Sequence, residues 1–168
     1  VLSGALPVFA EIDSSFNIDP EDLERRITPR TKAVLAIHLQ GTPCELDPIL
    51  ELSKRHGFRV LEDCAQCVGG AYRGRPVGSY GDIAIYSFQV NKTITAGEGG
   101  AVVTNDARLF ERAMRFHDVS SLREPYRGDL GGGVLGRFVA ANFRMSEFTG
   151  AVLRAQLEYA GYSNEDIH

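Results

Sequence analysis

The sequence predicts an α/β fold built on a mostly parallel sheet. Two short apolar runs, Ala33–His38 and Phe58–Leu61, are typical of strands that are covered on both faces. Between them, Leu46–His56 has the apolar spacing of a helix and is followed by Gly57, a common helix-ending residue. Strand, helix and strand at this spacing indicate a right-handed crossover, which makes the two strands parallel.

The remaining elements follow from local start and stop signals. Pro7–Ile12 is predicted as a short strand. A helix from Pro20 to about Ile27 is predicted by Asp19 as its N-cap, with proline at the first helical position. Residues 64–82 are rich in glycine and predicted to be irregular.

The second half of the chain continues with β-branched and aromatic runs. Ile83–Phe88 is predicted as a buried strand, and Ala101–Thr104 as its neighbour in the sheet. Asp106 is expected to cap a helix that ends near His117, and Ser146 a final helix. The core-facing positions predicted on these two helices are Leu109, Phe110, Ala113, Met114 and His117, and then Phe148, Ala151, Val152, Ala155 and Leu157.

Composition restricts the classes of function. The 168 residues are 43% hydrophobic and 24% charged, as in a soluble single domain. The net charge of −4 gives no basic surface for nucleic acid, and no apolar run approaches the roughly 18 residues of a membrane span. Three cysteines, an odd number, favour a reducing cytoplasm over a disulfide-rich secreted protein, and Val1 is interpreted as a cut end.

Three other patterns are weak. Cys64-Ala65-Gln66-Cys67 has the spacing of a redox or half-zinc motif, but a second pair is absent from the sequence, and the four histidines lack metal-ligand spacing. We therefore predict no metal site. Gly131–Gly136 matches a dinucleotide-binding pattern without the strand that should precede it. Asp118–Ala141 is too long for a plain connection and is interpreted as a binding, interface or disordered segment.

Lys92 and Asp63 are the candidate functional residues. Lys92 follows the Ile83–Phe88 strand, and an amine beside apolar neighbours is suited to form a Schiff base with a carbonyl compound. Asp63 follows the strand that contains Leu61, at the edge where parallel sheets bind ligands. A carboxylate there could pair with a protonated ring nitrogen, as in proteins that bind pyridoxal phosphate. Each residue also has an ordinary structural explanation when taken alone.

Six phrases in order carry a resemblance to a known family. The chain from Asp13 to Leu157 resembles the central part of the DegT/DnrJ/EryC1/StrS sugar aminotransferases, which depend on pyridoxal phosphate and have the type I aspartate-aminotransferase fold, a three-layer sandwich. The phrases are Thr28–Ala33, His38–Gly41, Glu62–Gln66, Gly78–Asp82, Ser87–Gly100 and Asn142–Glu147.

The resemblance implies a role for each matching site residue. Lys92 would form the Schiff base, Asp63 would pair with the pyridinium nitrogen, and Gln66 would lie near the 3-oxygen of the ring. Ser87 would hold the cofactor phosphate. Asn142 would reach the phosphate of the neighbouring subunit, because the family builds its sites across a homodimer interface.

The resemblance also implies the reaction and its alternatives. An amino group from glutamate or glutamine would move to a keto-sugar, often nucleotide-linked, or to a cyclitol ketone. Related sugar dehydratases have histidine in place of Lys92, which disfavours that alternative. Residues 1–168 would form the central part of the cofactor-binding large domain, with an N-terminal segment and a C-terminal small domain outside this chain. A catalytically incomplete dimerising or regulatory fragment is therefore the third hypothesis.

Overall fold

The computed structural model describes residues 3–121 and 138–161. The chain divides into two compact units, Val1–Gly81 and Asp82–His168, and both combine helices with strands. None of the helices in the described ranges is long and apolar enough to cross a membrane.

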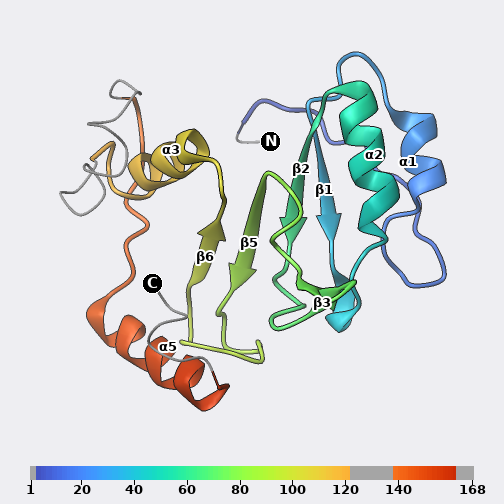
Figure 1. Cartoon of the computed structure of the whole chain (residues 1–168). Helices are drawn as coiled ribbons and strands as arrows, with labels where there is room; N and C mark the ends of the chain where they lie inside the picture. The colour runs from blue at the N-terminus through green and yellow to red at the C-terminus, as the bar shows by residue number, and fades with distance from the viewer. Residues whose placement is uncertain (1–2, 122–137, 162–168) are drawn as a thin grey trace. The chain divides into compact units, whose positions relative to one another are not determined.

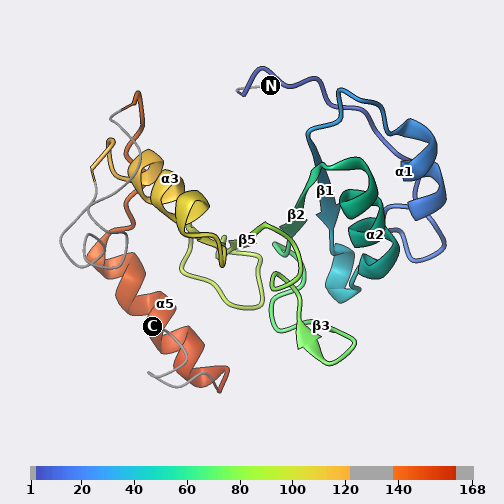
Figure 2. The same ribbon diagram turned by 45° about the horizontal axis from the view of Figure 1, so that its top comes forward.

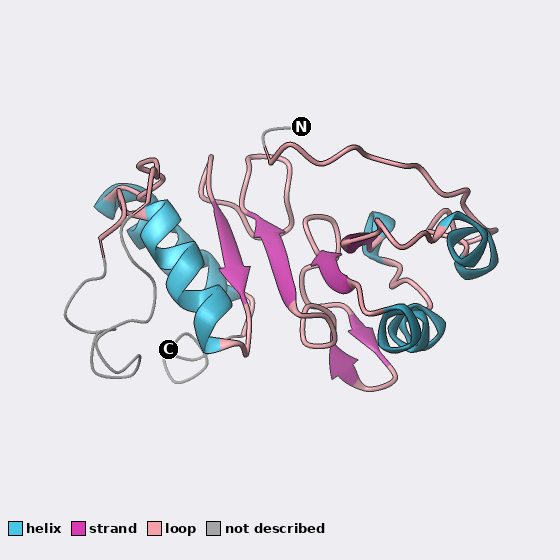
Figure 3. Cartoon of the chain, turned by 90° about the horizontal axis from the view of Figure 1, so that it is seen from above, coloured by secondary structure: helices cyan, strands magenta, loops and turns pink. Residues whose placement is uncertain are grey.

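The first unit is built on a parallel strand pair. β1 (Ala33–Ile37) runs parallel to β2 (Arg59–Asp63), and Ile37 lies opposite Asp63 at the end of the pair. α2 (Leu46–His56) contacts β2, and α1 (Pro20–Arg26) contacts α2, so both helices lie beside the strand pair (Figures 1 and 3). This arrangement confirms that the two strands are parallel with a helix between them, and it places the ends of β1 and β2 at one edge.

Capping signals explain where these two helices begin and end. The Asp19 carboxylate accepts a hydrogen bond from the backbone N–H of Glu21 at 2.9 Å, and Pro20 begins α1, as predicted. α2 ends at Gly57, whose φ of 76° is the left-handed conformation that glycine adopts without a steric penalty. Three buried side chains of α2 anchor it to the core: Leu46, Ile49 and Leu52.

Two expectations for the first unit were wrong. Pro7–Ile12 is not a strand: in ranges 3–121 and 138–161 its pairing is limited to an isolated bridge between Ile12 and Ile18, and Phe9 is 82% exposed. The glycine-rich segment contains a hairpin of β3 (Ala71–Tyr72) and β4 (Arg75–Pro76). Arg73 and Gly74 both have positive φ, so they form the kind of two-residue turn that matches the twist of a hairpin.

The described residues of the second unit form an antiparallel strand pair and two helices (Figures 1 and 2). β5 (Ile83–Ser87) pairs with β6 (Gly100–Val103), and Ser87 lies opposite Gly100. The prediction that these strands are neighbours is therefore confirmed. α3 (Ala107–His117) begins after Asp106, which caps the N–H groups of Arg108 and Leu109, and α5 (Glu147–Tyr159) begins after Ser146.

The predicted core-facing sides of α3 and α5 are less buried than expected. The five residues predicted on α3 are half-buried, and its one buried residue is Glu111. On α5, Phe148 is 88% exposed, so the described residues leave this position uncovered. Of the long segment Asp118–Ala141, residues 122–137 lie outside the described ranges, and so does Gly131–Gly136.

Candidate functional site

Two turns meet at the sheet edge where β1 and β2 end, and hydrogen bonds join one turn to the other. After β1, the chain turns through Leu39–Gly41, where Gln40 has a φ of 49°. The backbone N–H of Gly41 donates to the carbonyl of Gln66 at 2.8 Å, and that of Gln40 donates to the Gln66 side-chain oxygen at 3.3 Å. Two of the six family-like phrases, His38–Gly41 and Glu62–Gln66, therefore form one structural feature.

Asp63 ends β2 and is half-buried at this edge. Its Oδ1 accepts a hydrogen bond from the backbone N–H of Ala65 at 3.0 Å, and its carbonyl accepts one from the N–H of His38 at 3.0 Å. Among the described residues, its second carboxylate oxygen has no hydrogen-bond partner. One oxygen thus fixes the side chain while the other remains able to accept a bond from a ligand.

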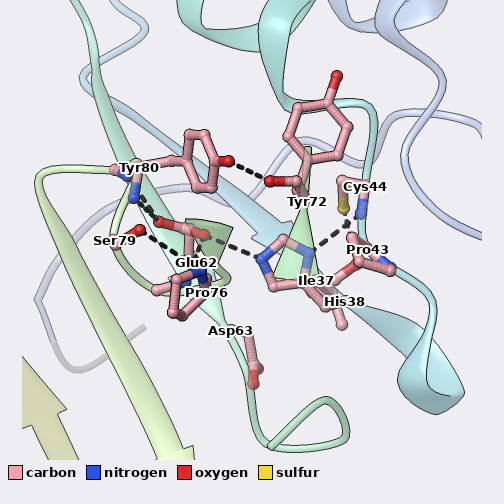
Figure 4. Close-up of polar contacts among 12 residues, drawn as sticks. Ile37, His38, Pro43, Cys44, Glu62, Asp63, Tyr72, Pro76, Ser79 and Tyr80 are labelled. Atoms are coloured by element: carbon pink, nitrogen blue, oxygen red, sulfur yellow. Dashed lines mark hydrogen bonds and ion pairs between the residues drawn. The ribbon is translucent and has the colours of Figure 1, made fainter. Parts of the chain in front are cut away.

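Glu62 lies on the opposite side of β2 and is fully buried (Figure 4). Its Oε1 accepts hydrogen bonds from the backbone N–H groups of Tyr80 at 2.8 Å and Gly81 at 2.6 Å. Its Oε2 accepts one from the N–H of Gly78 at 2.6 Å and lies 3.1 Å from Nε2 of His38. One carboxylate thus joins the end of β2, the turn at residues 78–81 and the end of β1.

The ionised form of Glu62 is favoured in this setting. Burial alone would raise the pKa of the carboxyl group, but the hydrogen bonds from His38 and from three backbone N–H groups outweigh it and lower the pKa. His38 is also fully buried, and its Nδ1 accepts the backbone N–H of Cys44 at 3.0 Å. Because Nδ1 is the acceptor, the ring proton is on Nε2, where it donates to Glu62.

Cys64 completes a cluster in which potential ligand atoms of His38, Glu62 and Cys64 all lie within 4.8 Å of one another. A cation here would have to displace hydrogen bonds that His38 and Glu62 already make. The expectation that the protein has no metal site stays a prediction. Burial raises the pKa of Cys44 to about 12 and also raises that of Cys67, so both are held as thiols.

Lys92 and Ser87 lie in the second unit. Ser87 is the last residue of β5, and Lys92 lies in the loop that leads to β6. This loop is closed by hydrogen bonds from Phe88 N–H to Gly99 and from Ala96 N–H to Phe88, both 2.9 Å long. The Phe88 and Ile94 side chains are buried beneath it. Lys92 is half-buried, and its backbone N–H donates to Gln89 at 2.9 Å.

Asn142 also lies in the second unit, ahead of α5. It is exposed, and it forms an isolated bridge with Asp118. Its side-chain oxygen accepts the N–H of Arg144 at 3.1 Å, and the Arg144 side chain pairs with Asp118 at 2.8 Å. These contacts leave the amide N–H₂ of Asn142 without a partner among the described residues.

The structure therefore distributes the predicted residues between the units. Asp63 and Gln66 share one turn of the first unit, and the second unit carries Ser87, Lys92 and Asn142. Sequence reasoning gave no functional role to His38 or Glu62. The sequence does contain a signal for them. A charged residue stands at a strand position that alternation places in the core, and a glycine-rich turn can supply backbone N–H groups to it.

Comparisons with known proteins identify what the chain is similar to. A model of the DegT/DnrJ/EryC1/StrS aminotransferase family matches residues 1–165. GDP-perosamine synthase of Escherichia coli O157:H7 is 40% identical over 160 residues, which are 94% of this chain and 42% of that protein. The L-glutamine:scyllo-inosose aminotransferase of Streptomyces griseus is 40% identical over 92% of this chain and 37% of its own length.

A solved structure agrees with these relatives. The Helicobacter pylori aminotransferase PseC, which is involved in the biosynthesis of pseudoaminic acid, superposes with a TM-score of 0.85 at 35% identity. The match covers 95% of this chain and 42% of that protein. The predicted α/β class is thereby confirmed, and the chain spans about two fifths of the length of the proteins that it matches.

Proposed function

The chain belongs to the DegT/DnrJ/EryC1/StrS aminotransferase family, and from this premise we propose that the complete protein is a pyridoxal-phosphate-dependent aminotransferase. Its acceptor would be a keto-sugar, commonly nucleotide-linked, or a cyclitol ketone, and its donor glutamate or glutamine. Two relatives named for GDP-perosamine and for scyllo-inosose support this choice of acceptor. The observation that carries the proposal is the family match, which includes Lys92 after β5 and Asp63 at the end of β2.

The side chains present fit this cofactor chemically. Asp63 has one carboxylate oxygen bound to Ala65 and one without a partner among the described residues, as a site for a protonated ring nitrogen requires. The Gln66 oxygen accepts the N–H of Gln40, which leaves its N–H₂ group to donate to the ring 3-oxygen. Ser87 accepts a bond from Gln89 at 3.4 Å and retains its own hydroxyl proton as a donor.

Each residue would contribute a separate action. When bound, pyridoxal phosphate supplies an electron-withdrawing ring attached to the reacting amino group. Asp63 would keep the proton on the ring nitrogen. The Nζ atom of Lys92 would first hold the cofactor covalently and then, once released as an amine, move a proton at the substrate carbon. Ser87 and Asn142 would donate hydrogen bonds to phosphate oxygens.

Assembly and location belong to the same proposal. We expect a homodimer in which Asn142 serves the site of the partner subunit, as the family resemblance implies. The other partners would be small molecules rather than nucleic acid, in keeping with the net charge of −4. Three cysteines that form no disulfide are consistent with the cytoplasm.

Covalent labelling of Lys92 tests this function. The complete protein should be yellow with pyridoxal phosphate, and borohydride reduction should bleach the absorbance and leave the cofactor attached to Nζ of Lys92. Lys92→Ala should lose the label and lower the transamination rate by orders of magnitude, because holding the cofactor and moving the proton use the same amine. A peptide map with the label on another residue, or near-normal turnover of Lys92→Ala, would contradict the assignment.

A further inference from the structure

We propose that the buried His38–Glu62 pair is a positioning pair that fixes the direction in which Asp63 presents its free carboxylate oxygen to the cofactor ring nitrogen. This inference rests on the proposed function and adds two residues to its site. His38 and Glu62 would not touch the cofactor. They would act through the backbone of β2.

Glu62 and Asp63 are adjacent residues of β2. Alternation along β2 turns the Glu62 side chain into the core, while Asp63 points away from the buried cluster (Figure 4). Because both oxygens of Glu62 are bound to groups of two other chain segments, the end of β1 and the turn at residues 78–81, the peptide that leads to Asp63 has little freedom to rotate. An immobile peptide before Asp63 gives its carboxylate a defined direction.

His38 contacts both Glu62 and Asp63. Its ring donates to Glu62, while its backbone N–H donates to the Asp63 carbonyl at 3.0 Å. Cys44 fixes the ring from the other side through its N–H, so the tautomer that donates to Glu62 is the one present. A change at His38 or Glu62 is therefore transmitted to the Asp63 backbone without any contact with the ligand.

The surroundings of Glu62 require a carboxylate at this position. The four groups that hydrogen-bond to Glu62 are all donors: the N–H groups of Gly78, Tyr80 and Gly81, and the ring of His38. A glutamine would direct its own N–H₂ group at some of these donors in either amide orientation. Glu62→Gln thus keeps the size of the side chain but leaves buried donors without an acceptor.

The experiment compares two ligands with the complete protein. One is pyridoxal phosphate, and the other is its analogue with C–H in place of the ring nitrogen, which cannot pair with Asp63. A charge-assisted hydrogen bond predicts a wild-type preference for pyridoxal phosphate of roughly 10- to 150-fold in Kd. Asp63→Ala should reduce this preference to about one. Glu62→Gln should reduce it severalfold toward that value while affecting the analogue less.

Two control variants separate positioning from general destabilisation. Glu24→Gln removes an exposed acid that pairs with Arg55, and Ile49→Val loosens the α2 core, so both should keep the wild-type preference. If Glu62→Gln does not fold, His38→Gln, which can still donate and accept, serves as the milder variant. Its preference should fall between those of the wild type and Asp63→Ala.

The possible failures are distinguishable. An unchanged preference in the folded Glu62→Gln and His38→Gln proteins, with both ligands weakened equally, would overturn the inference and leave the proposed function intact. Wild-type protein that binds neither ligand would overturn the proposed function and the inference with it. Stoichiometric zinc that disappears in Glu62→Gln would make Glu62 a metal ligand with His38 and Cys64, and would also overturn the inference.

Discussion

At the scale of single residues, Glu62 should make stability depend on acid pH. Its pKa is lower in the folded protein than the ordinary value of 4.5, because four hydrogen bonds to its carboxylate outweigh the effect of burial. A lowered folded-state pKa contributes stability that is fully present above about pH 4.5 and is lost as the pH falls through the folded-state value. The difference in unfolding free energy between wild type and Glu62→Gln should therefore shrink as the pH falls below 4.5.

Chemical unfolding of both proteins at pH values from about 7 to about 3 would measure this difference. Asp22 contributes acid sensitivity of its own, since its bond to Arg26 lowers its pKa to about 2. This contribution is common to both proteins and cancels in the comparison. If the difference in unfolding free energy between the two proteins grew toward low pH, the folded protein would hold Glu62 in its protonated form.

At the scale of elements, two glycines should respond to alanine with opposite signs. Gly57 ends α2 with a φ of 76°, whereas Gly150 lies inside α5, and an added Cβ would meet nothing within 4 Å at either position. Because the added methyl group makes no contact, only the conformational preference of the backbone should change the stability. Gly57→Ala should lower the unfolding free energy by about 1–2 kcal/mol, and Gly150→Ala should raise it by about 0.5–1 kcal/mol.

Thermal unfolding of the two variants beside the wild type measures both signs in one experiment. Equal shifts in the same direction would show that tertiary contacts, rather than backbone conformation, decide these positions. The two variants together also distinguish a glycine at a helix end from one inside a helix by the sign of the change in stability.

Local signals also explain which elements could be predicted from the sequence. Asp19, Asp106 and Ser146 each cap the helix predicted to follow them, because a cap acts on N–H groups only two or three residues away. The strand expected at Pro7–Ile12 fails because, within the described part of the chain, its β-prone residues have no pairing partner beyond one bridge. The β3–β4 hairpin was missed because its turn residues, Arg73 and Gly74, lack the usual Asn-Gly signal.

The residues of the candidate site also differ in whether the sequence alone could predict them. Asp63 and Lys92 could be predicted from the strands that precede them, and Gln66, Ser87 and Asn142 from a family resemblance. The role of Glu62 depends on Gly78, Tyr80 and Gly81, which lie sixteen to nineteen residues away. Periodicity places such a side chain inside the protein, but only the folded backbone shows that donors surround it.

At the scale of the whole molecule, one face of the β1 strand is left open by the described residues. Val34 and Ala36 are buried, whereas the alternate residues Leu35 and Ile37 are 48% and 43% exposed. An apolar strand face with this much exposure is unusual in a finished core. The matching proteins are more than twice as long as the matched region, which leaves ample chain in them for covering such a face.

We therefore expect residues 1–168, when produced alone, to bind pyridoxal phosphate weakly and to show no transamination. By the family resemblance, backbone donors for the phosphate and an aromatic residue that stacks on the ring would lie in the N-terminal segment expected outside these residues. Each lost charge-assisted hydrogen bond or ring contact is worth on the order of 1–3 kcal/mol, so Kd should rise by several orders of magnitude. Cofactor titration of this polypeptide beside the complete protein measures the difference. Micromolar or tighter binding by residues 1–168 would show instead that Asp63, Gln66 and Ser87, together with Lys92, suffice to hold the cofactor.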